Sequence, residues 1–251
     1  MNEFKGRRIL VTGGSSGIGR ACVQHLVNLG ASVGNLDLDT TRASDSIPFV
    51  EVSADVRDGA AVDQAVTQIA QSLGGIDALV NNAGVSFVGG VEDGTEDDWA
   101  RVLDINVGGY VRTIRAALPY LRQSRTATIV NISSTTATSG FRLRALYSAS
   151  KGAIEAMTRS IAADLVAEDI TVNAVNPGTV DTPFMTELAL QSDDPKATRA
   201  AFERRQPTGR MVRPEEVARA VEYCVDPVNR SLVGSTLVVD GGILASHITE
   251  A

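Results

Sequence analysis

The chain reads Arg8-Ile9-Leu10-Val11-Thr12-Gly13-Gly14-Ser15-Ser16-Gly17-Ile18-Gly19 near its N-terminus, and this stretch decides the fold. The apolar residues before Thr12 predict a buried strand, and apolar residues then recur at helical spacing from Ala21 to Leu29. A strand, a glycine-rich turn and a helix N-terminus together form an anion site, because free backbone N–H groups and the positive end of the helix dipole point at a phosphate. The glycines follow a G-x-x-x-G-x-G order rather than the more common G-x-G-x-x-G order. The stretch therefore predicts a phosphate-binding turn, with a flexible surface turn as the alternative.

Strand-like apolar runs alternate with helical patterns along the rest of the chain. Continuous apolar strands that alternate with helices are typical of a parallel sheet covered on both faces. The sequence therefore predicts an α/β fold, a Rossmann-type doubly wound parallel sheet of seven strands with helices on both faces. No repeat, linker or low-complexity segment interrupts the pattern, so residues 1–251 are expected to form one domain. The expected strands lie near Ile9–Val11, Ser32–Leu36, Phe49–Val52, Ala78–Asn81, Thr128–Ile132, Thr171–Val175 and Thr236–Val239, and the expected helices near Gly17–Leu29, Ala60–Ser72, Glu96–Arg122, Tyr147–Val166 and Glu215–Cys224.

Two segments depart from this alternation. Residues 38–47 are mostly small or polar and lack a helical period, which predicts a loop or a single turn between the second and third strands. Residues 178–214 form an insert after the sixth strand, with apolar residues at helical spacing from Phe184 to Leu190 and a charged helix that reaches Arg205. Because ligands bind outside the carboxyl ends of the strands in this fold, the insert is expected to be a lid over the crevice. An ordinary pair of surface helices is the alternative.

A second motif, Tyr147-Ser148-Ala149-Ser150-Lys151, places a phenol and an amine one helical turn apart. Residues i and i+4 of a helix share a face, so the two side chains are expected to be neighbours. A phenol has a pKa of about 10 and is a poor base near neutrality, but a nearby cation lowers that pKa by about 1–3 units. The motif therefore predicts a proton-transfer group that needs neither histidine nor a metal, although such a spacing also arises by chance.

A third motif joins the first two, because a strand near residues 128–132 runs into the hydroxyls of Ser133 and Ser134, and Ser134 lies 13 residues before Tyr147. Over essentially its whole length the chain resembles the short-chain dehydrogenase/reductase family, whose members carry the same parts in the same order. The resemblance implies a nicotinamide-dependent oxidoreductase. The matching pieces are Thr12–Gly19, Asp55, Asn81-Asn82-Ala83-Gly84, Asn106, Ser134, Tyr147 with Lys151, Pro177-Gly178 with Thr182, and Val239-Asp240-Gly241-Gly242.

The residue after the second strand predicts which nicotinamide cofactor binds. Asp37 lies 20 residues after Gly17, where a carboxylate accepts hydrogen bonds from the ribose hydroxyls of NAD and would repel the 2′-phosphate of NADP. The nearest following cation, Arg42, is five residues further on. NAD is therefore the expected cofactor, with Asp39 as the competing ribose ligand. By resemblance, the residues expected to bind NAD are Gly13, Ser15, Ser16, Gly17, Ile18, Gly19, Asp37, Asp55, Val56, Asn82, Ala83, Gly84, Tyr147, Lys151, Pro177, Gly178, Val180 and Thr182; a helix N-cap is the alternative for Asp55.

The resemblance also implies the division of labour in the reaction. A nicotinamide carries the hydride itself, so the protein supplies position, proton transfer and electrostatics. Tyr147 is the expected general base or acid, Ser134 is expected to hold the same substrate oxygen, and Lys151 is expected to lower the pKa of Tyr147. Asn106 matches the fourth catalytic residue of the family, which holds water in a proton relay from the lysine. A buried polar residue inside a helix is the alternative for Asn106.

Two arginines predict an acidic substrate. Arg144 and Arg205 match positions that bind the substrate carboxylate in hydroxybutyrate-type members of the family, and a guanidinium suits a carboxylate through its planar fork. A third arginine expected on the lid is Leu188 here, which predicts an apolar third wall. Together with Ser134 and Tyr147, the arginines predict a site for a small hydroxy acid or a 2-keto-3-deoxy sugar acid. A free-sugar dehydrogenase and a 3-oxoacyl thioester or acyl-carrier-protein reductase are the alternatives, as are solvated arginines.

Composition excludes several other classes. The chain of 251 residues is 43% hydrophobic and 21% charged, and its net charge of −7 disfavours a nucleic-acid partner. Two histidines and two cysteines, Cys22 and Cys224, lack ligand spacing, so no metal site or disulfide is expected. No apolar run is long enough for a membrane span or a signal peptide, which predicts a cytoplasmic protein. A cofactor-sensing regulator would not need Ser134, Tyr147 and Lys151 together, and the resemblance implies a homotetramer with residues 237–242 near a subunit contact.

Overall fold

The computed structural model describes residues 4–40 and 48–245 of the chain. Seven parallel strands form a single sheet in the order β3-β2-β1-β4-β5-β6-β7, which confirms the predicted fold class. The order reverses beside β1, and this is where ligands bind in doubly wound sheets. The strands are β1 (Arg8–Thr12), β2 (Ser32–Asp37), β3 (Val50–Ser53), β4 (Ala78–Asn81), β5 (Thr128–Ile132), β6 (Thr171–Pro177) and β7 (Thr236–Val239).

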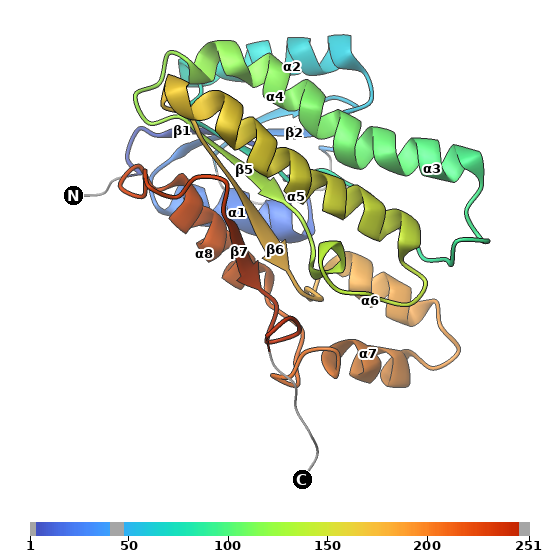
Figure 1. Cartoon of the computed structure of the whole chain (residues 1–251). Helices are drawn as coiled ribbons and strands as arrows, with labels where there is room; N and C mark the ends of the chain where they lie inside the picture. The colour runs from blue at the N-terminus through green and yellow to red at the C-terminus, as the bar shows by residue number, and fades with distance from the viewer. Residues whose placement is uncertain (1–3, 41–47, 246–251) are drawn as a thin grey trace.

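Helices cover both faces of the sheet (Figure 1). On one face α1 and α8 pack over a core that includes Val11, Leu26 and Val221, and on the other α2, α4 and α5 pack over a core that includes Leu10, Ile69 and Ile129. Consecutive residues of β1 thus enter opposite cores, as the side-chain alternation of a strand requires. The helices are α1 (Gly17–Asn28), α2 (Gly59–Leu73), α3 (Glu96–Leu103), α4 (Gly109–Leu121), α5 (Ala145–Leu165), α6 (Pro183–Leu190), α7 (Pro195–Glu203) and α8 (Pro214–Val225).

The single long helix predicted over residues 96–122 contains an irregular turn. It begins with a capping box, in which the side chains of Thr95 and Asp98 each accept from the other residue's backbone N–H. Between α3 and α4 the segment Asp104–Gly108 is a π-helical turn that contains Asn106. Single π turns inside helices are frequent at functional sites, because they redirect the side chains that follow. The helical period of the sequence continues through this turn, so periodicity alone did not reveal it.

The connection between β2 and β3 was predicted to be a loop over residues 38–47. Residues 38–40, 48 and 49 are in neither helix nor strand, whereas residues 41–47 of this predicted loop, including Arg42, lie outside the described residues.

The predicted insert contains two helices, α6 and α7, which pack together at the carboxyl end of the sheet (Figure 1). They share a small apolar core of Ala189, Phe202 and Met211, against which Met185 and Leu188 pack. Leu188 therefore stabilises the packing of α6 against α7, and it is not among the residues that line the adjacent cavity. The expectation that Leu188 forms an apolar wall of the substrate site is thus wrong, because its side chain packs against the apolar core that the two helices share. That the insert acts as a lid stays a prediction.

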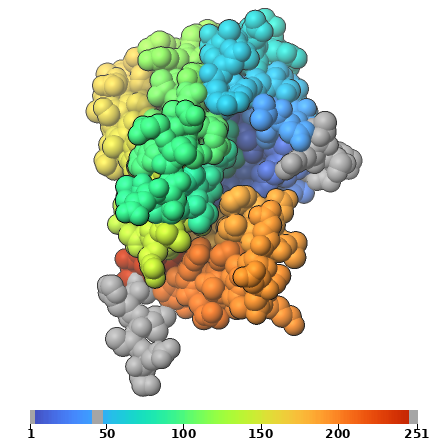
Figure 2. All heavy atoms as spheres, turned by 90° about the vertical axis from the view of Figure 1, so that its right-hand side faces the viewer, coloured from blue at the N-terminus to red at the C-terminus, as the bar shows by residue number. Residues whose placement is uncertain are grey.

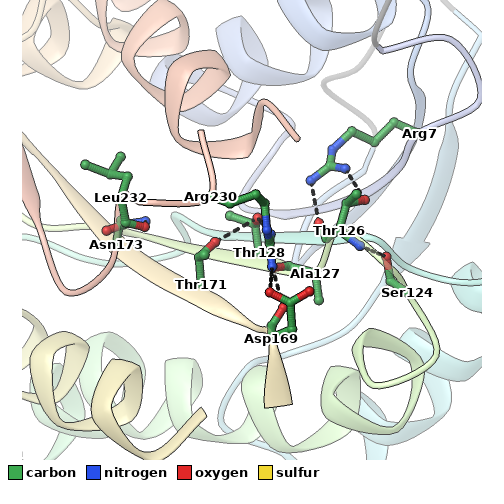
Figure 3. A network of polar contacts seen from close by, with 10 residues as sticks. All are labelled: Arg7, Ser124, Thr126, Ala127, Thr128, Asp169, Thr171, Asn173, Arg230 and Leu232. Carbon is green, nitrogen blue, oxygen red and sulfur yellow. Dashed lines mark hydrogen bonds and ion pairs between the residues drawn. The ribbon is translucent and has the colours of Figure 1, made fainter. Parts of the chain in front are cut away.

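Arg230 and Arg7 form a network of hydrogen bonds at the amino end of the sheet, opposite its carboxyl edge (Figure 3). Arg230, from the loop before β7, donates to the carbonyl of Ala127 at 2.9 Å and to Oδ1 of Asp169 at 2.9 Å. Arg7 lies nearby and donates to the hydroxyl of Thr126 at 2.7 Å and to its carbonyl at 2.9 Å. These bonds tie the entries of β5, β6 and β7 together far from the carboxyl edge, so the loops at that edge are free to serve a ligand.

Among the described residues, no helix combines the length and the apolar character that crossing a bilayer requires. Within the same ranges, no group of three histidine, cysteine or acidic side chains is arranged to hold a metal ion. Cys22 and Cys224 are free and buried, and burial raises the pKa of each thiol to about 12.

Candidate active site

A cleft of about 940 Å³ opens at the carboxyl edge of the sheet. Figure 2 shows its mouth as a hollow between the green surface of α3 and the orange surface of α6 and α7, with the blue N-terminal segment at its base. The loops that follow β1, β4, β5 and β6 all contribute residues to its lining. Parallel strands place their carboxyl ends at one edge, so motifs that are far apart in the sequence meet in one cleft.

Tyr147 and Lys151 lie one turn apart near the start of α5, and both line the cleft together with Ser134. Burial raises the pKa of Tyr147, while the nearby Arg144 guanidinium and a hydrogen bond with Ser134 act in the opposite direction. Ser134 is itself fixed after β5, because its hydroxyl accepts the backbone N–H of Thr136 at 3.3 Å. The structure thus brings the predicted phenol and hydroxyl together.

Lys151 is anchored by a carbonyl at the end of β5. Its Nζ donates to the carbonyl oxygen of Ile132 at 2.9 Å, and the hydroxyl of Tyr110 donates to the same oxygen at 3.1 Å. Nζ lies 5.7 Å from the centre of the Tyr147 ring, and burial lowers the pKa of Lys151 to about 8. Arg144 and Ser134 lower the pKa of Tyr147 without overcoming the rise that burial causes. The predicted lowering by Lys151 stays a prediction. Tyr110, which shares the anchoring carbonyl, was not predicted at all.

Asn106 is fully buried and does not line the cleft. Its Oδ1 accepts the backbone N–H of Val85 at 2.8 Å, and its Nδ2 donates to the carbonyl of Val85 at 2.9 Å and to the hydroxyl of Ser150 at 3.0 Å. The side chain therefore joins the loop after β4 to α5, between Tyr147 and Lys151. The water-holding role that the family resemblance implies stays a prediction.

The glycine-rich turn has the geometry of a phosphate cradle. Gly13 and Gly17 have positive φ angles of 69° and 53°, a region that other residues rarely adopt. A Cβ on Gly13 would lie 2.9 Å from the Cα of Ala83, and a Cβ on Gly19 only 2.0 Å from the carbonyl oxygen of Gly13. Ser16 caps α1 without a side-chain hydrogen bond, which leaves the first N–H groups of the helix available to an anion.

Asn35, in the middle of β2, organises this turn and was not singled out by the sequence analysis. It is fully buried; its Oδ1 accepts the backbone N–H of Gly14 at 2.7 Å, and its Nδ2 donates to the hydroxyl of Ser15 at 3.0 Å and to Glu51 at 3.3 Å. A Cβ on Gly14 would lie 2.4 Å from Oδ1 of Asn35. The signal in the sequence was a polar amide in an otherwise apolar buried strand, which requires a partner.

Two acidic residues line the opposite end of the cleft. Asp37 accepts the backbone N–H of Ser15 at 2.9 Å, whereas Asp39 does not line the cleft. Asp55 pairs with Arg57 through contacts of 2.6 to 3.1 Å, and the hydrogen bond from Arg57 lowers the pKa of Asp55. The alternative that Asp55 caps the next helix is wrong, because Asp58 occupies the N-cap of α2.

The buried carboxylate of Glu155 binds residues at the ends of two strands beside the cleft. Oε1 of Glu155, one turn after Lys151 on α5, accepts from Nδ2 of Asn176 at 2.7 Å and from the hydroxyl of Ser133 at 3.3 Å. Ser133 and Asn176 come directly before Ser134 and Pro177, so one side chain links α5 to the ends of β5 and β6. Burial raises the pKa of Glu155. Neither Glu155 nor Asn176 was predicted, because their partners are distant in the sequence.

Arg144 and Arg205 both line the cleft, from the N-cap of α5 and from the segment after α7. Nη1 of Arg144 donates to the hydroxyl of Ser86 at 3.0 Å and to the carbonyl of Phe87 at 3.2 Å, and Arg205 lies over the ring of Phe202 at 4.7 Å. Neither has an ion pair within the described ranges. Burial lowers both pKa values, and the charge of Arg144 lowers that of Arg205 further.

The cleft thus collects most of the residues predicted from the sequence. Ser15, Gly19 and Asn106 lie behind its wall. Arg101, Phe141, Phe184 and Met185 line it but were not predicted to do so. The predicted residues that line it are Gly13, Ser16, Gly17, Ile18, Asp37, Asp55, Val56, Asn82, Ala83, Gly84, Ser134, Arg144, Tyr147, Lys151, Pro177, Gly178, Val180, Thr182 and Arg205.

Comparison with known proteins extends over almost the whole chain. A family model described as enoyl-(acyl carrier protein) reductase matches residues 13–244. 2-(S)-hydroxypropyl-CoM dehydrogenase 3 of Xanthobacter autotrophicus is 35% identical over 97% of this chain and 99% of its own length. Dehydrogenase/reductase SDR family member 6 of Rattus norvegicus is 34% identical over 96% of this chain and 99% of its own length. The ligand-free structure of aldohexose dehydrogenase from Thermoplasma acidophilum has a TM-score of 0.93 at 31% identity and covers 100% of this chain and 98% of its own.

The first prediction concerns the proton-transfer group. Tyr147→Phe should fold and bind a nicotinamide cofactor but lose about 10²–10⁴-fold in kcat, the usual contribution of a positioned acid or base. The deprotonated fraction of Tyr147 grows with pH, and because burial raises its pKa this growth continues above the ordinary range of a tyrosine. Oxidation by the wild type should therefore accelerate with rising pH, and oxidation by the variant should not. Steady-state kinetics across pH measure both effects. A variant within a few-fold of wild type would remove Tyr147 from the chemistry.

The second prediction concerns Asn35. Asn35→Ala removes hydrogen bonds to Gly14 and Ser15 and should weaken cofactor binding about 10-fold, as expected for one or two such bonds. Calorimetric titration with cofactor measures the Kd. Asn173→Ala is the matched control, because Asn173 is an equally buried strand asparagine whose side chain bonds Leu232 and Ser235 instead. Equal cofactor affinities of the two variants would contradict the role of Asn35.

Proposed function

The chain belongs to the short-chain dehydrogenase/reductase family, and we propose that it is an NAD-dependent enzyme that interconverts a secondary alcohol and a ketone on a small hydroxy acid or deoxy sugar acid. One observation carries the proposal. The cleft holds Tyr147, Ser134 and Lys151 beside Arg144 and Arg205, two guanidiniums without an ion pair within the described ranges, while Asp37 lies at its far end.

The residues of the cleft fit a dinucleotide. The glycine turn packs so tightly that a Cβ at Gly13 or Gly19 would clash with the backbone, and the turn opens on the free N–H groups of α1. When bound, the nicotinamide would accept or return the hydride. Pro177, Gly178, Val180 and Thr182, from the loop after β6, line the cleft and are proposed to hold its ring.

The choice of NAD rests on Asp37. Its carboxylate lies beside the glycine turn, where the backbone N–H of Ser15 fixes one oxygen. The other oxygen accepts the backbone N–H of Asp39 at 3.4 Å. The carboxylate is proposed to bind the ribose hydroxyls, and a 2′-phosphate there would meet a like charge. Arg57, the cation that lines the same end of the cleft, is already paired with Asp55, so it supplies no unpaired charge for a phosphate.

Each side chain then has a defined task. Tyr147 takes the proton from the substrate hydroxyl in oxidation and returns it in reduction, while Ser134 holds the same oxygen. Arg144, whose charge opposes the rise in the pKa of Tyr147, also stabilises the phenolate. Lys151, held by the carbonyl of Ile132, is proposed to orient the nicotinamide ribose and to pass the proton on towards water held near Asn106.

The acidic substrate class rests on the two arginines. Burial lowers the pKa of Arg205, and the charge of Arg144 lowers it further, because two cations that share one cleft repel each other. A bound carboxylate would relieve that repulsion and accept the planar hydrogen bonds that a guanidinium offers. Arg144 also lies close enough to Tyr147 to affect its pKa, so the acid group would lie near the reacting carbon.

A free-sugar dehydrogenase is the second candidate, because the aldohexose dehydrogenase of Thermoplasma acidophilum has nearly the same fold over the whole chain. A reductase of carrier-bound substrates is the third candidate, because the family model that matches the chain is described as enoyl-(acyl carrier protein) reductase. The homotetramer and the cytoplasmic location that the family resemblance implies also belong to this proposal. In support of a subunit contact, β7 is an edge strand whose Val238 is half-exposed.

The cofactor assignment predicts that kcat/KM with NAD exceeds that with NADP. Asp37→Ala should lower the ratio of kcat/KM with NAD to kcat/KM with NADP about 10–100-fold. It removes a charge-assisted hydrogen bond of about 1.5–3 kcal/mol to NAD, and it removes the repulsion of the 2′-phosphate of NADP. Kinetics with both cofactors measure the ratio, and Asp39→Ala, which changes a carboxylate outside the cleft, should leave it as it is. A wild-type enzyme that uses NADP as well as NAD would refute the assignment.

The substrate assignment predicts that small hydroxy acids outperform their amides and esters. Arg144→Ala and Arg205→Ala should each lower kcat/KM for the acids about 10–100-fold, on the same scale for a charge-assisted bond, and leave NAD affinity unchanged. Arg142→Ala and Arg204→Ala are matched controls, because Arg142 and Arg204 are exposed arginines, as Arg205 also is, but do not line the cleft. Should aldoses be the best substrates and both variants remain fully active, the free-sugar alternative is correct.

A further inference from the structure

A second cavity of about 540 Å³ adjoins the substrate end of the cleft, and we call it the side cavity. It lies between the loop around residue 90 and the loop that leads from β5 into α5. Thr136, Phe141 and Arg144 line both spaces, so the two share a wall. The other residues that line it are Gly90, Val91, Ala137, Thr138, Ser139, Gly140, Leu143, Ala145 and Ser148.

The side cavity begins close to the reacting groups. Thr136 donates its backbone N–H to the hydroxyl of Ser134 at 3.3 Å, and Ser148 directly follows Tyr147 on α5. A substituent on a carbon that reacts at Tyr147 would lie near the side of the cleft formed by Thr136 and Phe141, which the side cavity shares. The carboxylate proposed for Arg144 and Arg205 would lie on the side of Arg205, which lines the cleft and not the side cavity.

Hydrogen bonds join the two loops that form the walls of the side cavity. Gly89 donates its N–H to the carbonyl of Leu143 at 2.9 Å, and Arg144 donates to Ser86 and Phe87, so the two loops are joined. Leu143 has a φ angle of 57°, a left-handed conformation that is a genuine outlier for a bulky residue. Such strain persists only where the surroundings impose it, and it is concentrated at ligand sites. The left-handed backbone at Leu143 leaves its side chain exposed in the wall of the side cavity, while Arg144, the next residue, lines the cleft.

The lining selects a neutral ligand. Its only charged member is Arg144, which the cleft already uses, and its other members are aliphatic, aromatic, hydroxyl-bearing or glycine. Valine, leucine, alanine and phenylalanine surfaces favour an aliphatic chain, because removing such a chain from water is favourable.

We propose that the side cavity binds a neutral aliphatic tail on the reacting carbon, so that the substrate is a hydroxy acid with more than four carbons. The inference rests on the proposed function for the acid group, and the tail is an addition to it. The preference of the enzyme for substrates of a given size would then be set by the side cavity rather than by the arginines.

A chain-length series of 3-hydroxy acids with four, six and eight carbons tests the proposal with the full-length enzyme and NAD. We expect kcat/KM to rise by up to about fourfold for each buried methylene. Val91→Trp and, independently, Ala145→Phe should fill the side cavity and bring the eight- to four-carbon ratio close to one. Val88→Trp is the matched control, because Val88 is half-exposed three residues earlier and lines neither space, so it should keep the wild-type ratio. A wild-type preference for the four-carbon acid, or a ratio unchanged in both filling variants, would overturn the proposal.

A parallel series of neutral secondary alcohols, from 2-butanol to 2-octanol, separates the two hypotheses. If the acids are not substrates but the alcohols show a chain-length gain that Val91→Trp and Ala145→Phe abolish, the proposed substrate class fails and the side cavity keeps its role. If the acids depend on Arg144 but neither series depends on chain length, the side cavity is not a substrate site.

Discussion

Parallel pairing is the constraint on which the rest of this molecule depends. Because all seven strands run in the same direction, each one delivers its carboxyl end to a single edge of the sheet. The glycine turn after β1, the Asn82–Gly84 segment after β4, Ser134 after β5 and Gly178 after β6 are therefore neighbours in space. The opposite edge is fastened by Arg230 and its partners, so stability and ligand binding are assigned to different ends of the same sheet.

The electrostatics of the cleft follow from burial within that edge. Burial opposes charge, so it raises the pKa of Tyr147 and lowers that of Lys151 to about 8. Arg144 acts against the shift of Tyr147 and at the same time disfavours the charge of Arg205. The end of the cleft that holds Arg144 and Arg205 thus carries positive charge that no ion pair among the described residues balances, and the proposal of an anionic substrate rests on this charge.

Buried polar side chains, most of them not predicted from the sequence, hold this arrangement in place. Asn35 fixes the glycine turn from β2, Asn106 joins the loop after β4 to α5, and Glu155 links α5 to the ends of β5 and β6. The carbonyl of Ile132 accepts from both Lys151 and Tyr110, so even the position of the lysine depends on the end of a strand. A buried polar group without a partner is unfavourable, and for this reason such networks tolerate few alternative geometries.

The fold class and the order of most elements followed from the sequence alone, because hydrophobic period and local motifs are properties of adjacent residues, and the family resemblance supplied most of the predicted residues that gather in the cleft. The strand, glycine turn and helix at the N-terminus could be derived in this way, as could the shared face of Tyr147 and Lys151. What depends on contacts between distant segments was decided only by the tertiary structure. The π turn at Asn106, the packing of Leu188 between α6 and α7, the hydrogen bonds of Asn35 and Glu155, and the influence of Arg144 on the pKa of Tyr147 belong to this class. Hydrogen bonding and desolvation act through space, and a one-dimensional pattern does not contain the distances on which they depend.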